Sequence, residues 1–265
     1  MNEFFKAIVL GVVEGITEFL PISSTGHLII LNQWIAFGEE FTKTFDVVIQ
    51  LGAIFAVVAY FWDRLWPFGK SQKDRGVIFD TWKKAVIGVL PALILGFLFG
   101  EEIEARLFDP VIVATMLFLG GILLILVDRQ KINHSTFSIR EMSYRTVLLI
   151  GLIQAVAMIP GTSRSAATII GGIFLGLSRA TAAEFSFFLA IPTMTAASGY
   201  TLMRSGFSLS SSELAVLATG FFVSFVVAWA VIRAFINYIQ KNDFRYFGYY
   251  RIILGVVVFL YFFQG

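Results

Sequence analysis

The sequence contains no cysteine and has few charged residues for its length. Its 265 residues include 6 prolines and only 14% charged residues, against 57% hydrophobic residues. The absence of cysteine excludes disulfides, thiolate metal sites and cysteine nucleophiles. The formal net charge of +2 is too small to indicate a nucleic-acid partner. A mean hydropathy of +0.81 places the chain among membrane proteins rather than soluble domains.

Apolar runs dominate the sequence and favour spanning helices. They cover residues 47–62, 85–99, 111–127, 185–203, 214–232 and 249–263. Two further apolar segments, 4–37 and 147–178, are interrupted by the turn sequences LPISSTG and IPGTSRS. Non-helical backbone is tolerated at membrane depth only where protein buries it or where it lines a water-filled cavity. The sequence therefore predicts an all-α polytopic membrane protein with six spanning helices and two re-entrant helical hairpins.

The two interrupted segments resemble each other. Aligning them, with one residue of slippage before the proline, pairs Glu14 with Gln154 and Ser24 with Ser163. This alignment indicates an internal repeat of roughly 140 residues. Each repeat contains one hairpin and three spanning helices. Because three is an odd number, the second repeat enters the membrane from the opposite side, and we expect the two hairpin tips to meet near the midplane. We expect one membrane domain over 1–265, with repeat 1 at about 1–130 and repeat 2 at about 140–265.

The basic residues of the loops predict the orientation in the membrane. Four lie on the side of the N-terminus: Lys6, Lys43, Arg106 and Arg204. Thirteen lie on the opposite side: Arg64, Lys70, Lys73, Arg75, Lys83, Lys84, Arg129, Lys131, Arg140, Arg145, Arg179, Lys241 and Arg245. Since basic loops stay in the cytoplasm, we expect both termini and the mouth of the first hairpin to face outward.

The stretch EGITEFLPISSTGH, residues 14–27, carries two acidic side chains. Glu14 and Glu18 are four residues apart, so both carboxylates lie on one helix face. In an apolar segment a cation, an arginine or a proton has to accompany them. Because Mg²⁺ takes one or two protein carboxylates together with phosphate oxygens, we interpret the pair as a site for Mg²⁺ or Ca²⁺ shared with a phosphorylated substrate. Alternatively, one glutamate is protonated and both only hydrogen-bond the hairpin.

The same stretch supplies a candidate nucleophile. A turn at Thr25 and Gly26 brings the imidazole of His27 to the hydroxyl of Ser24, which it would serve as general base. Thr25 and Gly26 would then line the substrate site. The alternative role of these hydroxyls is to cap the second hairpin helix, and we expect that role for Ser23.

The second interrupted segment, PGTSRS, places Arg164 just ahead of an apolar helix. The free N–H groups of a helix N-terminus attract anions, and the guanidinium fork suits phosphate oxygens. We predict a phosphate cradle made by Arg164 with Thr162, Ser163 and Ser165. The alternative is that Arg164 only neutralises Glu14 or Glu18 as a structural ion pair.

Three polar residues of the spanning runs give weaker signals. Asp46 and Glu184 lie where spanning helices begin, and an acidic residue near a helix N-terminus is favoured by the helix dipole. We expect a structural role for both. Gln50 lies one turn deeper than Asp46 and is a candidate substrate-binding residue. The residues alone thus indicate an intramembrane site for an anionic, phosphorylated lipid.

The motifs EGITEFLPISSTGH and PGTSRS resemble the two signature motifs of the bacterial undecaprenyl-diphosphate phosphatase family, and the similarity covers essentially the whole chain. The resemblance implies hydrolysis of undecaprenyl diphosphate to the monophosphate in the plasma membrane, recycling the lipid carrier for peptidoglycan, and a link to bacitracin resistance. It implies that Glu14 and Glu18 are the acidic pair, Ser24 and His27 the nucleophile and base, and Arg164 the phosphate-binding arginine. It further implies inverted repeats and a site open to the outer face.

A different class of function is compatible with the same pattern. Inverted repeats with broken helices are typical of transporters, so a polyprenyl-phosphate flippase or an ion-coupled carrier is the alternative. A carrier needs the arginine and the cation but not a nucleophile beside a base. The sequence does not reveal the oligomeric state, and a homodimer is compatible with it.

Overall fold

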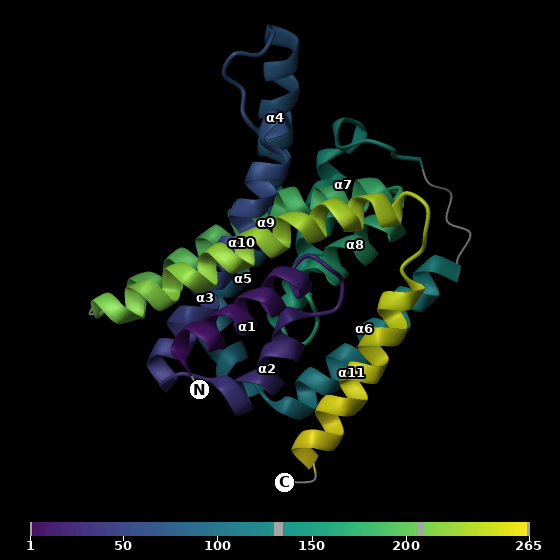
Figure 1. Cartoon of the computed structure of the whole chain (residues 1–265). Coiled ribbons are helices and arrows are strands. Elements are labelled where there is room, and N and C mark those ends of the chain that lie inside the picture. The colour runs from purple at the N-terminus through teal and green to yellow at the C-terminus, as the bar shows by residue number, and fades with distance from the viewer. Residues whose placement is uncertain (1, 130–134, 206–208, 264–265) are drawn as a thin grey trace.

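The computed structural model describes residues 2–129, 135–205 and 209–263. Lys131 and the side chain of Arg204, both counted in predicting the orientation, lie outside this part. The elements in order are α1 Glu3–Thr17, α2 Ser24–Ile35, α3 Glu39–Tyr60, α4 Trp62–Leu65, α5 Gln72–Leu107, α6 Pro110–Arg129, η1 Ile139–Glu141, α7 Tyr144–Gln154, η2 Ala155–Met158, α8 Arg164–Phe174, α9 Arg179–Ser205, α10 Ser211–Ile239 and α11 Arg245–Phe263. The fold is all-helical over the described residues apart from an isolated bridge between Thr136 and Leu177 (Figure 1).

Five helices of the described chain are long and apolar enough to cross a membrane. They are Glu39–Tyr60, Gln72–Ile103, Pro110–Val127, Ser211–Ile239 and Arg245–Phe263. Four of them contain a predicted span, and Glu39–Tyr60 covers the span 47–62 except for its last two residues. The sixth predicted span, 185–203, lies within α9 but is not among these five. Many large apolar side chains face outward, such as Phe97 at 86% and Phe222 at 64% exposure. Such a surface is stable in lipid rather than in water.

Both interrupted segments are broken helices with the same local geometry. After α1 the chain turns before α2, and after α7 and η2 it turns before α8. Ser23 has φ 71° and Ser163 has φ 69°, and no other described residue besides glycine has a positive φ. The two turns therefore pair Ser23 with Ser163, so the sequence alignment, which paired Ser24 with Ser163, was wrong by one residue. Ser23 and Ser163 are 140 residues apart, as are Glu14 and Gln154. The two segments therefore align with one constant offset and without slippage before the proline.

The helices of the two halves exchange partners. Helix α10, from the second half of the chain, packs against α1 and α3 of the first half. Helix α5, from the first half, packs against α7 and α9 of the second half. Close approach depends on glycine: a Cβ at Gly11 would lie 2.8 Å from the carbonyl oxygen of Gly220, and a Cβ at Gly151 would collide with the backbone of Gly88. Helix α3 also packs against α9, and α6 packs against α11. The start of α1 and the end of α11 lie toward the bottom of Figure 1, and α4 lies at the top.

Glu184 and Asp46 have structural partners in the described chain. Arg64 donates through both Nη1 and Nη2 to the Glu184 carboxylate, each at 2.6 Å. Asn32 Nδ2 donates to Asp46 Oδ2 at 3.0 Å, whereas Asp46 Oδ1 is buried without a partner. The structural role expected for Glu184 therefore has a geometric basis, and Asp46 keeps one oxygen free.

Candidate active site

The acidic pair lies at the end of α1. Glu14 is 1% exposed, and neither of its carboxylate oxygens has a hydrogen-bond partner in the described structure. Glu18 forms the C-cap of α1 and is also buried. The negative charges of Glu18 and Asp46 both act on Glu14. A buried carboxylate without a partner is costly, so Glu14 is the side chain of this site that most needs a positive partner.

Glu18 joins the two motifs. Its Oε2 accepts from Ser24 Oγ at 2.7 Å, and its Oε1 faces Nη2 of Arg164 at 3.4 Å. The side chains of Arg164 and Glu18 are only 11% and 6% exposed. The ion pair considered from the sequence is therefore present with Glu18. Each oxygen of a carboxylate has two lone pairs, so Glu18 retains capacity for a further ligand.

Arg164 is held from a second side by α9. Its Nη1 donates to the Ser186 carbonyl at 2.8 Å and to Ser186 Oγ at 3.2 Å. Thr168 Oγ1 also donates to Ser186 Oγ, at 2.7 Å. The Nε of Arg164 is buried without a partner, so one donor of the fork is left for a ligand. Sequence reasoning missed Ser186, because it is a small residue within an apolar run.

The first turn positions Ser24 toward Glu18 rather than toward His27. Ser23 Oγ accepts from the Gly26 N–H at 3.4 Å as the N-cap of α2, so its predicted capping role is confirmed. Ser24 is the first residue of α2, and its hydroxyl donates to Glu18. The expected hydrogen bond between Ser24 and His27 is not among those of the described residues, because the imidazole turns back to the Ser23 carbonyl.

His27 has two partners that fix its tautomer. Nδ1 lies 2.7 Å from the Ser23 carbonyl oxygen, and Nε2 lies 2.7 Å from the Tyr250 hydroxyl. Because a carbonyl oxygen only accepts, Nδ1 carries the proton and Nε2 accepts from Tyr250. The two rings are stacked, with centroids 5.6 Å apart. Tyr250 comes from α11, and sequence reasoning missed it because aromatic residues fill that helix.

The predicted substrate-binding residues divide between the two turns. Thr25 and Gly26 lie in the first turn of α2, and Thr162, Ser163 and Ser165 lie around the N-terminus of α8. Ser163 caps α8 by accepting from the Ala166 N–H at 3.2 Å. Ser165 Oγ donates to the Leu20 carbonyl at 2.9 Å and so ties the second motif to the first. Thr162 Oγ1 is buried without a partner. Gln50 is half-buried on α3.

Four of the eight buried side-chain atoms without a hydrogen-bond partner in the described structure belong to motif residues. Glu14 Oε1 and Oε2, Thr162 Oγ1 and Arg164 Nε are all buried without partners in the described structure. Native proteins satisfy nearly all buried polar groups, so these atoms are the ones a ligand would complete. The acceptors at Glu14 suit a cation, and the donors at Arg164 and Thr162 suit an anion. No group of three or more His, Cys, Asp or Glu side chains able to hold a metal occurs among the described residues.

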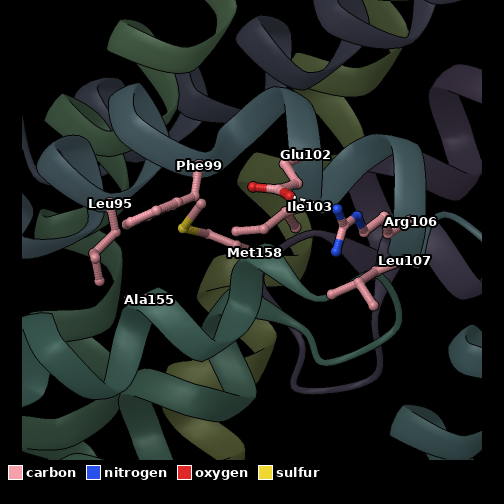
Figure 2. Close-up of a pocket in the computed structure, with 8 residues that line it drawn as sticks. All are labelled: Leu95, Phe99, Glu102, Ile103, Arg106, Leu107, Ala155 and Met158. Carbon is pink, nitrogen blue, oxygen red and sulfur yellow. Dashed lines mark ion pairs between the residues drawn. The ribbon is translucent and has the colours of Figure 1, made fainter.

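A separate cavity of about 340 Å³ lies between the second half of α5 and η2 (Figure 2). Its lining is mainly apolar, and Met158 reaches across it toward Phe99. At its edge Arg106 forms an ion pair with Glu102 at 2.7 Å. None of the predicted site residues lines this cavity. It carries no nucleophile, so the chemistry is expected at the meeting of the two turns instead.

The chain is similar to known proteins over almost its full length. A family model described as bacitracin resistance protein BacA matches residues 7–257. The undecaprenyl-diphosphatase of Enterococcus faecalis is 46% identical over 266 residues, covering 97% of this chain and 96% of that protein. Undecaprenyl-diphosphatase 1 of Oenococcus oeni is 49% identical, and the match covers 96% of this chain and 94% of that protein. The undecaprenyl-diphosphatase of Acetivibrio thermocellus is 48% identical, and the match covers 99% of this chain and 98% of that protein. The chain belongs to the BacA family.

Proposed function

We propose that this chain hydrolyses undecaprenyl diphosphate to undecaprenyl phosphate and inorganic phosphate where the turns of the two motifs meet. The observation that carries the proposal is the set of buried, unpartnered atoms on Glu14, Thr162 and Arg164. They offer acceptors for a cation beside donors for an anion, which is what a metal-bound diphosphate requires. The relatives that share 46–49% of its residues are named for this activity.

A divalent cation, Mg²⁺ or Ca²⁺, fits the acidic pair. Glu14 supplies two free oxygens, and Glu18 retains lone pairs beyond those used by Ser24 and Arg164. When bound, such a cation supplies charge stabilisation for the phosphoryl oxygens. A diphosphate brings several negative charges into a poorly solvated site, where interactions between charges are strong. Arg164 alone does not neutralise them.

Ser24 is the proposed nucleophile. Its Oγ attacks the terminal phosphorus, the bond from that phosphorus to the bridging oxygen breaks, and undecaprenyl phosphate leaves. The proton of Ser24 passes to Glu18, because the 2.7 Å hydrogen bond already points that way. Arg164 binds the phosphoryl oxygens through Nε and an Nη group. Thr25, Gly26, Thr162, Ser163, Ser165 and Gln50 are the proposed substrate-binding residues.

His27 acts in the second step of the proposal. Its Nε2 is the unprotonated nitrogen, since Nδ1 donates to the Ser23 carbonyl. A water that replaces the Tyr250 hydroxyl at Nε2 gives up a proton and attacks the phosphoserine. The serine oxygen recovers its proton from Glu18, inorganic phosphate is released, and His27 returns to the neutral form by passing its proton to the departing phosphate or to water. Phosphohistidine formation and direct attack by water are the alternatives, and Ser24→Ala separates the serine route from both of them.

The membrane arrangement belongs to the same proposal. The segments α1–α2 and α7–η2–α8 form two re-entrant hairpins of inverted repeats, at about 1–130 and 140–265, and α9 is the sixth span. The exchange of α5 and α10 between the halves supports this pseudo-symmetry. Outward-facing termini follow from the distribution of basic residues in the loops. The bacterial plasma membrane and a site open to the outer face follow from the family resemblance. A homodimer remains compatible with this arrangement.

The alternative of a polyprenyl-phosphate flippase or an ion-coupled carrier is not supported by the relatives, which are named as diphosphatases. Release of inorganic phosphate from undecaprenyl diphosphate by the purified, detergent-solubilised chain tests the proposal. We expect release that stops in EDTA and resumes with excess Mg²⁺ or Ca²⁺. Glu14→Gln provides the inactive comparison, and Glu39→Gln, an exposed residue of α3, provides the matched control. No phosphate release with either cation would exclude the proposed function.

A further inference from the structure

Arg251 is a buried arginine that neither sequence motif contains. It lies in α11 and is 0% exposed. All five of its hydrogen bonds in the described structure go to backbone carbonyls: Pro21 at 3.3 Å, Met116 at 3.0 Å, Leu117 at 3.3 Å, Gly161 at 3.0 Å and Thr162 at 2.9 Å. An arginine inside a membrane protein needs partners that replace water. Here carbonyl oxygens, rather than a carboxylate, fill that role.

Two of these carbonyls occupy equivalent places in the two motifs. Pro21 lies two residues before Ser23, and Gly161 lies two residues before Ser163. Both serines have the positive φ that reverses the chain into the next helix. Nη1 bonds the first carbonyl and Nη2 bonds the second. Because the guanidinium is planar and rigid, it fixes the spacing between the two turns.

The packing of α6 against α11 leaves room for this guanidinium. A Cβ at Gly120 would collide with Nη2 of Arg251. A Cβ at Gly121 would lie 2.6 Å from the Gly248 carbonyl oxygen, and one at Gly248 would lie 2.7 Å from that of Gly121. The two helices therefore run in close contact, as the neighbouring α6 and α11 ribbons of Figure 1 show. Glycine on both helices lets Arg251 reach the turns.

The residues that follow the two turns are those assigned to the chemistry. Ser24 comes directly after Ser23, and Arg164 comes directly after Ser163. We propose that Arg251 is a positioning residue, which sets the relative position of the Ser24 hydroxyl and the Arg164 fork by bonding both turns. The inference rests on the proposed function but assigns Arg251 no contact with substrate. A small displacement of reacting groups has a large effect on rate.

The hydrogen bonds from Arg251 to the Pro21 and Gly161 carbonyls form a clamp between the two turns. Two substitutions disturb this clamp by different routes. Arg251→Lys keeps the charge but loses the fork, and Gly120→Ala keeps Arg251 but displaces its guanidinium. Gly199→Ala in α9 is the matched control, since a Cβ there meets no atom within 4 Å. For both clamp variants we expect kcat to fall by about 100-fold, with KM changed by less than about threefold because ground-state binding is retained. The double variant is expected to be no slower than the slower single variant, since both changes break the same bonds.

Hydrogen exchange tests the clamp without substrate. The amides of Gly26 and Ala166 bond to Ser23 Oγ and Ser163 Oγ, so their exchange reports on the two turns. We expect faster exchange at both amides in Arg251→Lys and Gly120→Ala, and native exchange in Gly199→Ala. If the native chain releases no phosphate, the proposed function fails while the exchange result still tests the clamp.

The outcomes separate positioning from the two other roles open to a buried arginine. Native kcat in folded Gly120→Ala, with only a lower thermal midpoint, would overturn the inference in favour of a role in stability. A loss in Arg251→Lys that appears in KM, with Gly120→Ala unaffected, would overturn it in favour of direct contact with substrate. Should Arg251→Lys fail to fold, Gly120→Ala decides alone. Unchanged exchange at Gly26 and Ala166 would also refute the clamp.

Discussion

Replacing Glu14 with glutamine is expected to stabilise the protein when divalent cations are absent and to remove its response to them. Glu14 is 1% exposed, and both of its carboxylate oxygens lack partners in the described structure. Without a cation this buried carboxyl group either stays charged or takes up a proton at a free-energy cost, and an uncompensated buried charge costs about 3–5 kcal/mol in measured cases. An unsatisfied amide costs about 1–3 kcal/mol. The expected net gain is therefore about 2 kcal/mol. For a chain of this size, that raises the unfolding midpoint by about 4–8 °C.

The assay is thermal unfolding of the detergent-solubilised protein in EDTA and with a saturating divalent cation. A cation at 100 times its Kd stabilises the native chain by about 2.7 kcal/mol, and we expect no such shift in Glu14→Gln. The control Glu39→Gln changes a side chain that is 90% exposed and should move the midpoint little. The reasoning is refuted if Glu14→Gln keeps the native cation-induced shift, or if it is less stable than the native chain in EDTA.

Three further predictions concern rate and topology. Arg164→Lys is expected to lower kcat/KM by about 10–100-fold, because a lysine ammonium group lacks the forked donors that bond Ser186 and phosphate at the same time. Near-native turnover of this variant would contradict the prediction. Ser24→Ala should be far slower than Ser23→Ala in phosphate release, since Ser23 only caps α2, and a native rate for Ser24→Ala would eliminate the serine as nucleophile. A cysteine at Lys73, in a chain without cysteines, should resist an impermeant reagent applied to intact cells, and labelling from outside would reverse the predicted orientation.

The class of the protein and the location of its motifs were predictable from the sequence. Apolar composition leaves few alternatives to helices in lipid, and five predicted spans fall in helices suited to crossing a membrane. The capping role of Ser23 was also predictable, because a cap depends on residues three positions away. Glu14, Glu18 and Arg164 were identifiable because charged residues within apolar segments are rare.

Contacts between distant segments could not be predicted from the sequence and became visible only in the folded chain. The alignment placed Ser163 opposite Ser24, and the positive φ of Ser23 and Ser163 moved this pairing by one residue. Local spacing brought His27 to Ser24 in our prediction, yet the hydroxyl bonds Glu18 and the imidazole bonds the Ser23 carbonyl. Side-chain rotamers and backbone dihedrals, which spacing does not specify, make that choice.

Tyr250 and Arg251 show why the remaining parts of the site escaped sequence reasoning. Both belong to α11, more than 220 residues from the first motif that they contact. Nothing local distinguishes them from other aromatic and basic residues near the start of a spanning helix. Their roles arise because α11 packs closely on α6 through Gly121 and Gly248. The close packing of these two helices brings a tyrosine to His27 and an arginine to both turns.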